Sequence, residues 1–226
     1  MTAAGGLISV LVGTVLLRLV VTGTYERYVR VGMGPWLAVA GVAVVVLGLV
    51  TLAQALRHAE PGDAHGHRGG GDRVGWLLLA PIAALLLVAP PTLGSYGVGR
   101  GARVDVRAGG AVLPKITARD QPVRMTLLEF GQRAFDHDGA SFNGVTVQLT
   151  GFVVGSEAGG FRLARYEIAC CAADAAPVVL RVVGVRGPAR DRWVTVTGTY
   201  QPGGGDVPVL AATNAIEVPP PRDPYE

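Results

Sequence analysis

Charged residues and cysteines are both scarce in this 226-residue chain. Only 16% of the residues are charged, whereas soluble domains usually carry about a quarter. A positive mean hydropathy of +0.39 also points toward a membrane protein. The net charge of +3 is too small to indicate nucleic-acid binding by itself. Two cysteines cannot build a disulfide framework, so they do not fix the redox compartment.

Long apolar runs fill the first part of the chain. They cover residues 5–22, 35–56 and 74–93, and each is close to the roughly 20 residues that a helix needs to cross a hydrocarbon core. A cleaved signal peptide is the alternative for the first run, but no basic residue precedes its apolar core. The sequence therefore predicts a membrane anchor, residues 1–93, with three transmembrane helices in a lipid bilayer.

The linker between the second and third runs, residues 57–73, contains three histidines: His58, His65 and His67. Short histidine-bearing tracts can bind metal. The same stretch is rich in glycine and acidic residues, which is typical of a flexible connector. Three histidines without a fixed scaffold make a poor closed metal site. The linker interpretation is therefore favoured, and the histidines stay weak metal candidates.

The second half of the chain has the pattern of a small β-rich domain. Residues 94–119 form a joint rich in glycine and arginine, and a short helix is expected within residues 120–133. From residue 144 onward, apolar and polar residues alternate in five segments separated by turn residues. Residues 120–226 are therefore expected to form a soluble domain with a five-stranded OB-like β-barrel.

An OB-like barrel raises the question of nucleic-acid binding, which needs a basic groove and exposed stacking aromatics. The available aromatic side chains mostly occupy apolar strand positions and are more typical of a core: Phe152, Phe161, Tyr166, Trp193 and Tyr200. We expect no nucleic-acid partner, since a fold alone implies no function.

Adjacent cysteines, Cys170 and Cys171, are the most distinctive feature of the β-rich half. They could be reduced core or half-core residues, ligands of a soft metal such as Cu(I) or Zn(II) together with Asp174, or a dithiol that forms a labile disulfide. A nucleophilic role has less support, because His137 is the only histidine in this half. Arg165 is a possible charge partner of Asp174 or of a thiolate.

Several segments together carry a resemblance that covers nearly the whole chain. These are the apolar runs with the histidine-bearing linker, then VQLTGFV, FRLARYEIACCAADA, WVTVTGTY and the terminal PPRDPYE. The chain resembles the bacterial membrane family typified by YcgQ, which is described as a permease subunit. The resemblance implies an integral membrane protein that acts with a separate multi-span permease, and a C-terminal domain outside the cytoplasm. It supplies no catalytic residues.

The resulting expectation is an accessory subunit of a permease in the cell membrane, with an unknown substrate. The alternative is a soft-metal-binding or thiol-redox module at the membrane surface. An enzyme is not expected, because the sequence contains no recognisable catalytic arrangement. The run of glycines at 203–205 follows a strand pattern within a hairpin, so it is no phosphate loop. No cofactor is required, and a soft metal at Cys170 and Cys171 is the one candidate.

Overall fold

The computed structural model describes residues 3–57, 93–100, 104–106, 113–116 and 122–226. The chain divides into two compact units, Met1–Pro91 and Thr92–Glu226, and each is described by itself. The predicted third transmembrane run, up to residue 92, lies outside the described residues, as do His58, His65 and His67.

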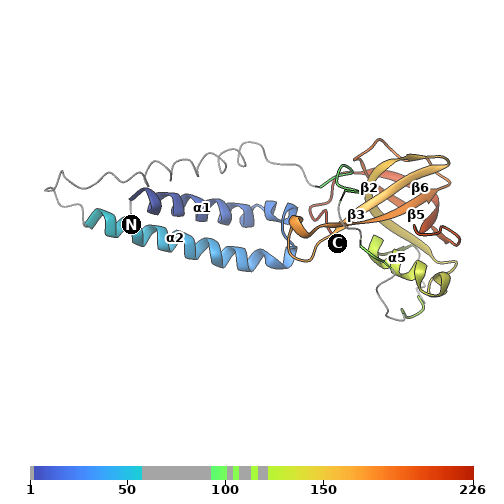
Figure 1. The fold of residues 1–226 in the computed structure, drawn as a ribbon, viewed down its shortest axis with the longest axis horizontal. Helices are drawn as coiled ribbons and strands as arrows, with labels where there is room; N and C mark the ends of the chain where they lie inside the picture. The colour runs from blue at the N-terminus through green and yellow to red at the C-terminus, as the bar shows by residue number, and fades with distance from the viewer. Residues whose placement is uncertain (1–2, 58–92, 101–103, 107–112, 117–121) are drawn as a thin grey trace. The chain divides into compact units, whose positions relative to one another are not determined.

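Two long helices make up the described part of the first unit. Helix α1 covers Ala3–Val21 and α2 covers Gly34–Arg57, so the helices expected from the first two apolar runs are confirmed. Two short 3-10 turns, Thr24–Arg27 and Val31–Met33, connect them. The chain reverses at this connection, and α1 and α2 lie side by side in opposite directions (Figure 1).

The two helices pack against each other through glycines that recur every seven residues. A Cβ atom added to Gly6 would lie 3.0 Å from the carbonyl oxygen of Gly48. One added to Gly13 would lie 2.8 Å from the carbonyl oxygen of Gly41. Small residues of this kind allow close approach of helix backbones. Larger side chains at these positions would push α1 and α2 apart.

The outward faces of this helix pair are apolar. Both helices are long and apolar enough to cross a membrane. Large hydrophobic side chains are exposed along them, among them Leu7, Leu11, Trp36, Val39, Val42, Val46 and Leu47. In water, so large an apolar surface would be unusual for a monomeric protein.

The second unit, called here the β-domain, contains one six-stranded mixed sheet (Figure 1). Its strands are β1 (Val123–Arg124), β2 (Thr146–Glu157), β3 (Gly160–Glu167), β4 (Ala176–Val183), β5 (Trp193–Gln201) and β6 (Val209–Val218). The order is β1-β2-β3-β4-β6-β5, with a further pairing of β2 and β5. The β1–β2 and β4–β6 pairs are parallel, and the other pairs are antiparallel.

The five predicted strand segments are confirmed as β2 to β6, and β1 is an additional strand. The expectation of helix from residue 120 is wrong at its start, because Val123 and Arg124 pair with β2. Helix α5 covers Leu127–Phe135 and begins after Thr126, whose side-chain oxygen accepts the N–H of Glu129 at 2.9 Å. An N-cap bond of this type sets the first residue of a helix.

Buried side chains gather in two clusters in the β-domain. The larger, the helix-side core, lies between the sheet and α5 and includes Leu127, Phe130, Phe142, Leu149, Phe161 and Leu163. The smaller, the loop-side core, consists of Phe152, Val154, Ala164, Tyr166, Ile168, Trp193 and Tyr225. Four of the five aromatics expected in the core are buried, and Tyr200 packs against the helix-side core half-buried.

The beginning of the predicted joint belongs to the β-domain. Leu93 and Val98 pack against the loop-side core. The backbone N–H of Ser95 donates to Asp191 Oδ1 at 2.7 Å, and the Tyr166 hydroxyl donates to the carbonyl of Gly94 at 3.0 Å. These bonds and contacts hold residues 93–98 against the β-domain, with Ser95 buried.

A candidate metal centre in the cysteine loop

The cysteine pair lies in the loop between β3 and β4. Strand β3 ends at Glu167 and β4 begins at Ala176, with a short 3-10 turn, Ala172–Asp174, between them. Ala172 and Ala175 pack against the loop-side core, which fixes one face of this turn. Cys170 is exposed and Cys171 is half-buried, so neither cysteine belongs to a core. A fully buried position is thus excluded for both cysteines, whereas the half-buried position of Cys171 agrees with the half-core interpretation.

Cys171 is the N-cap of this turn. Its thiol accepts a hydrogen bond from the backbone N–H of Asp174, and the Asp174 side chain accepts one from the N–H of Cys171. This reciprocal arrangement is a capping box, in which serine or threonine normally occupies the N-cap position. A hydroxyl would serve the backbone equally well. The sulfur atom is therefore not explained by the fold of the loop.

The carboxylate of Asp174 is the centre of the loop. Its Oδ1 accepts the N–H of Ala169 at 2.9 Å, and its Oδ2 accepts the N–H groups of Cys170 at 2.9 Å and Cys171 at 3.3 Å. The hydrogen bond from the Cys170 thiol, followed by these backbone bonds, lowers the pKa of Asp174 to about 2. The carboxylate is therefore ionised at neutral pH and held in one orientation.

The thiol of Cys170 donates to this carboxylate, with Sγ 2.9 Å from Asp174 Oδ2. The hydrogen bond to Asp174, and next the one to Cys171, raises the pKa of Cys170 to about 11. Reactive cysteines usually have a lowered pKa, because the thiolate is the nucleophile. Cys170 is thus a poor nucleophile near neutral pH in this arrangement.

The three side chains form one compact group of potential ligands. The sulfur atoms of Cys170 and Cys171 are 3.7 Å apart. One ligand atom from each of Cys170, Cys171 and Asp174 lies within 4.8 Å of the others. The fold thus brings together three side chains that could hold a metal ion. Two thiols and a carboxylate suit a soft or borderline cation.

Other residues considered from the sequence lie apart from this group. His137 is 78% exposed and pairs with Asp136, its Nε2 lying 3.7 Å from Oδ1. Arg165 contacts neither Asp174 nor a cysteine in any described bond. Its guanidinium donates to the backbone carbonyls of Asp223 and Tyr225 and lies 3.7 Å from a carboxylate oxygen of Glu226. Arg165 therefore holds residues 223–226 on the sheet.

Glu226 is a buried carboxylate that sequence reasoning did not identify. Its two oxygens accept the N–H groups of Leu127 at 3.0 Å and Leu128 at 3.2 Å, at the start of α5. Its side chain is only 3% exposed, and burial raises the pKa of Glu226 despite these bonds and the charge of Arg165. This carboxylate fastens residues 223–226 to the helix and is no ligand site.

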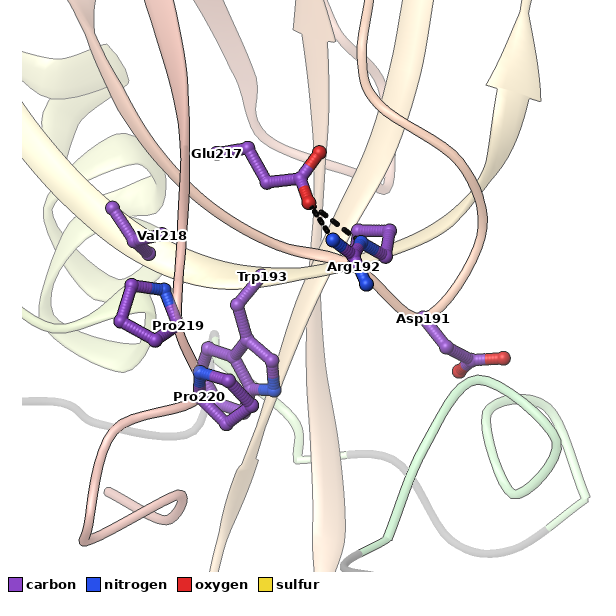
Figure 2. A pocket seen from close by; sticks show the side chains of 7 residues that line it. All are labelled: Asp191, Arg192, Trp193, Glu217, Val218, Pro219 and Pro220. Atoms are coloured by element: carbon purple, nitrogen blue, oxygen red, sulfur yellow. Dashed lines mark hydrogen bonds and ion pairs between the residues drawn. The ribbon is translucent and has the colours of Figure 1, made fainter.

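A hollow of about 410 Å³ lies beside Trp193 at the start of β5 (Figure 2). Its lining consists of Asp191, Arg192, Trp193, Glu217, Val218, Pro219 and Pro220. Arg192 Nε donates to Glu217 Oε1 at 2.6 Å, so these two charges neutralise each other. Figure 2 shows Asp191 pointing away from this pair, and Asp191 already accepts the N–H of Ser95. The lining offers no obvious chemistry.

A wider groove of about 720 Å³ crosses β2, β5 and β6 next to the start of α5. Its polar side chains already have hydrogen-bond partners. Arg124 Nε donates to Gln148 Oε1 at 3.0 Å, and the hydroxyls of Thr150 and Thr195 are 2.9 Å apart. Arg165, which also lines the groove, is committed to residues 223–226. The cysteine loop therefore remains the strongest candidate for a functional site among the described residues.

Comparison with protein families gives a match within the β-domain. No curated protein and no solved structure matches the chain. The matching family model begins within α5 and includes β2 to β6, so it contains the cysteine loop and Glu226. A DUF1980 C-terminal domain, from an uncharacterised family, is found at residues 131–226.

Proposed function

We propose that this protein binds a thiophilic metal ion in the cysteine loop of a membrane-anchored β-domain. The observation that carries the proposal is the group of ligand atoms from Cys170, Cys171 and Asp174 within 4.8 Å of one another. Metal binding makes use of the sulfur atoms, which loop capping does not require. The exposure of Cys170 gives an ion access from solution.

Metal binding to the purified full-length chain tests this proposal. We expect one ion per chain after incubation with Zn(II) or, under reducing conditions, Cu(I), measured by elemental analysis after desalting. The double variant Cys170→Ser, Cys171→Ser keeps a side chain able to cap the turn but removes both thiolates. It should lose the ion. Stoichiometric binding by that variant would exclude the cysteine loop as the site.

A matched control removes a surface carboxylate elsewhere in the β-domain. Glu157→Gln breaks only an exposed ion pair with Arg162. Glu157→Gln should keep full metal binding. Comparison with Asp174→Asn then separates the role of the Asp174 carboxylate from a general effect of acidic side chains. The histidine linker has its own control, the triple variant His58→Ala, His65→Ala, His67→Ala, which should also retain the ion.

Thiol redox chemistry is the competing use of the same loop. A disulfide would bring the two sulfur atoms from 3.7 Å to about 2.05 Å, with loss of two electrons and two protons to an external oxidant. Mass spectrometry of the protein from native membranes decides between metal binding and thiol redox chemistry. An internal disulfide in most molecules would favour the redox interpretation.

The second proposed function is that of an accessory subunit to a multi-span permease. The exposed apolar faces of α1 and α2 favour it, because they suit contact with lipid or with other transmembrane helices. We propose further that the β-domain faces away from the cytoplasm. Co-purification from native membranes in mild detergent tests the partnership. A chain that emerges alone and monodisperse would contradict it.

We also propose that the five long strands of the β-domain close into an OB-like barrel. The supporting observation is that β2 pairs with β3 through one part and with β5 through another, so the pairings return to their start. A short helical turn between β3 and β4, the second and third strands of that circuit, suits the same fold. An experimental structure lacking the β2–β5 ladder would contradict the barrel.

A further inference from the structure

The arrangement of the ligands favours one coordination geometry over another. Two sulfur atoms bound to a tetrahedral ion at about 2.3 Å lie about 3.8 Å apart, whereas two bound on opposite sides of an ion lie about 4.6 Å apart. The observed distance between the sulfurs of Cys170 and Cys171 is 3.7 Å. The loop thus has the spacing of a tetrahedral site before any ion is bound.

Asp174 provides the third corner. The proton of the Cys170 thiol now lies between Sγ and Asp174 Oδ2, which are 2.9 Å apart. An ion in place of that proton would widen this separation to about 3.5 Å in a tetrahedral Zn(II) site. Oδ2 also accepts the N–H groups of Cys170 and Cys171, so the ion either takes the place of the thiol proton there or binds Oδ1, which accepts the N–H of Ala169. A carboxylate oxygen also favours Zn(II) over Cu(I), which prefers sulfur ligands.

The fourth corner has no ligand from the described part of the chain. The group contains three potential ligands, and Cys170 and Asp174 are both exposed. Closed structural zinc sites have four protein ligands, whereas sites with three keep a position for water or another molecule. An exposed loop leaves that position open toward solution.

Resting on the proposed metal binding, we infer that the cysteine loop is an open three-ligand Zn(II) site that takes a fourth, external donor. The donor is a nitrogen or sulfur ligand of the kind that histidine and cysteine side chains provide. Such a site passes an ion to another molecule or receives one more readily than a closed site, because the incoming ligand does not have to displace a protein ligand first.

Cobalt(II) spectroscopy of the full-length protein in detergent tests the inference. The protein carries His58→Ala, His65→Ala and His67→Ala, so that the linker histidines cannot contribute. We expect one Co(II) per chain, with tetrahedral d–d absorption, a thiolate-to-metal charge-transfer band, and displacement by Zn(II). Added imidazole should shift the d–d bands saturably and leave the charge-transfer band in place.

The outcomes separate this inference from the proposed function. Uptake of Cu(I) without Zn(II) or Co(II), or a Co(II) spectrum that does not respond to imidazole, would overturn the open zinc site and leave metal binding intact. Absence of binding for all three metals would overturn both.

Two variants determine whether Asp174 is a ligand or only a brace of the loop. Asp174→Asn keeps an oxygen acceptor for the backbone but has no charge, and we expect it to weaken Zn(II) binding at least tenfold. Asp174→Cys loses the backbone acceptor but keeps a ligand atom, and we expect binding within tenfold of the wild type or tighter. Equal loss in both variants would show that Asp174 is not a ligand.

Discussion

Two carboxylates of the β-domain accept similar backbone hydrogen bonds, but their pKa values are shifted in opposite directions. Asp174 accepts three N–H groups of its own loop, and its pKa is lowered to about 2. Glu226 accepts two N–H groups at the start of α5 and has Arg165 close by, yet its pKa is raised. The hydrogen bonds alone do not account for this difference.

Solvent exposure accounts for it. Asp174 is exposed, so its hydrogen bonds add to a charge that water still stabilises. The side chain of Glu226 is 3% exposed, and the loss of hydration outweighs its favourable partners. The charge of Asp174 is therefore available to an ion from solution, whereas Glu226 serves to hold two parts of the domain together.

Removal of the buried carboxylate should have the largest effect on stability. Glu226→Ala leaves the N–H groups of Leu127 and Leu128 without their acceptor and Arg165 without its ion-pair partner. We expect a loss of about 2–4 kcal/mol in the free energy of unfolding. The corresponding fall in Tm is roughly 5–15 °C. Trp193 fluorescence follows the unfolding in a background with Trp36→Phe and Trp76→Phe.

A change of Tm below about 1 °C would contradict this assignment of Glu226. The backbone bonds of residue 226, to Tyr166 and Ile168, do not involve its side chain and remain in the variant. The measured loss therefore reports the carboxylate and not the strand pairing.

Prediction from the sequence succeeds where the pattern is local. Apolar runs predict α1 and α2, and alternation predicts β2 to β6. The seven-residue spacing of Gly6 and Gly13, and of Gly41 and Gly48, was also readable as a packing signal. The spacing of Cys171 and Asp174 similarly matches a capping box, with cysteine in place of serine.

Contacts between distant residues were not predictable in this way. Arg165 was considered as a charge partner of Asp174 or of a thiolate, but its partners in the structure are about 60 positions further along the chain. Glu226 meets Leu127 across 99 positions. No local periodicity marks such pairs, because they form only when the completed fold brings distant segments of the chain together.

Loss of the exposed carboxylate should have a smaller effect, on chemistry instead of stability. Asp174→Asn removes the charge that holds the thiol proton of Cys170, whose pKa is about 11 against an ordinary 9.0. If the substitution returns the pKa of Cys170 halfway toward 9.0, the thiolate fraction rises on the order of tenfold. We expect a similar increase in the rate of alkylation by iodoacetamide at pH 8, measured by mass spectrometry in a Cys171→Ser background. An unchanged rate would show that Asp174 does not control the thiol.

The pH dependence of stability should also separate the two carboxylates. Since the pKa of Glu226 is raised above 4.5, its contribution is fully present below pH 4.5 and is lost as the pH rises through the folded value. The stability of the wild type relative to Glu226→Gln should therefore fall from pH 4.5 to pH 7. Asp174 contributes above its unfolded pKa of 3.8 and loses this only toward pH 2, so Asp174→Asn should show no such slope. A flat difference for Glu226→Gln would contradict the effect of burial.

The smallest effect is expected for a carboxylate with an exposed partner and no backbone donors. Glu157 Oε1 lies 3.0 Å from Arg162 Nε, and the side chains of Glu157 and Arg162 are 35% and 44% exposed. Surface ion pairs of this kind usually contribute about 0.2–1 kcal/mol. Glu157→Gln should therefore change the Tm by less than about 3 °C in the same Trp193 assay. If it cost as much as Glu226→Ala, burial would not be what distinguishes the carboxylates of this domain, and the separation of a structural charge at Glu226 from a ligand charge at Asp174 would lose its physical basis.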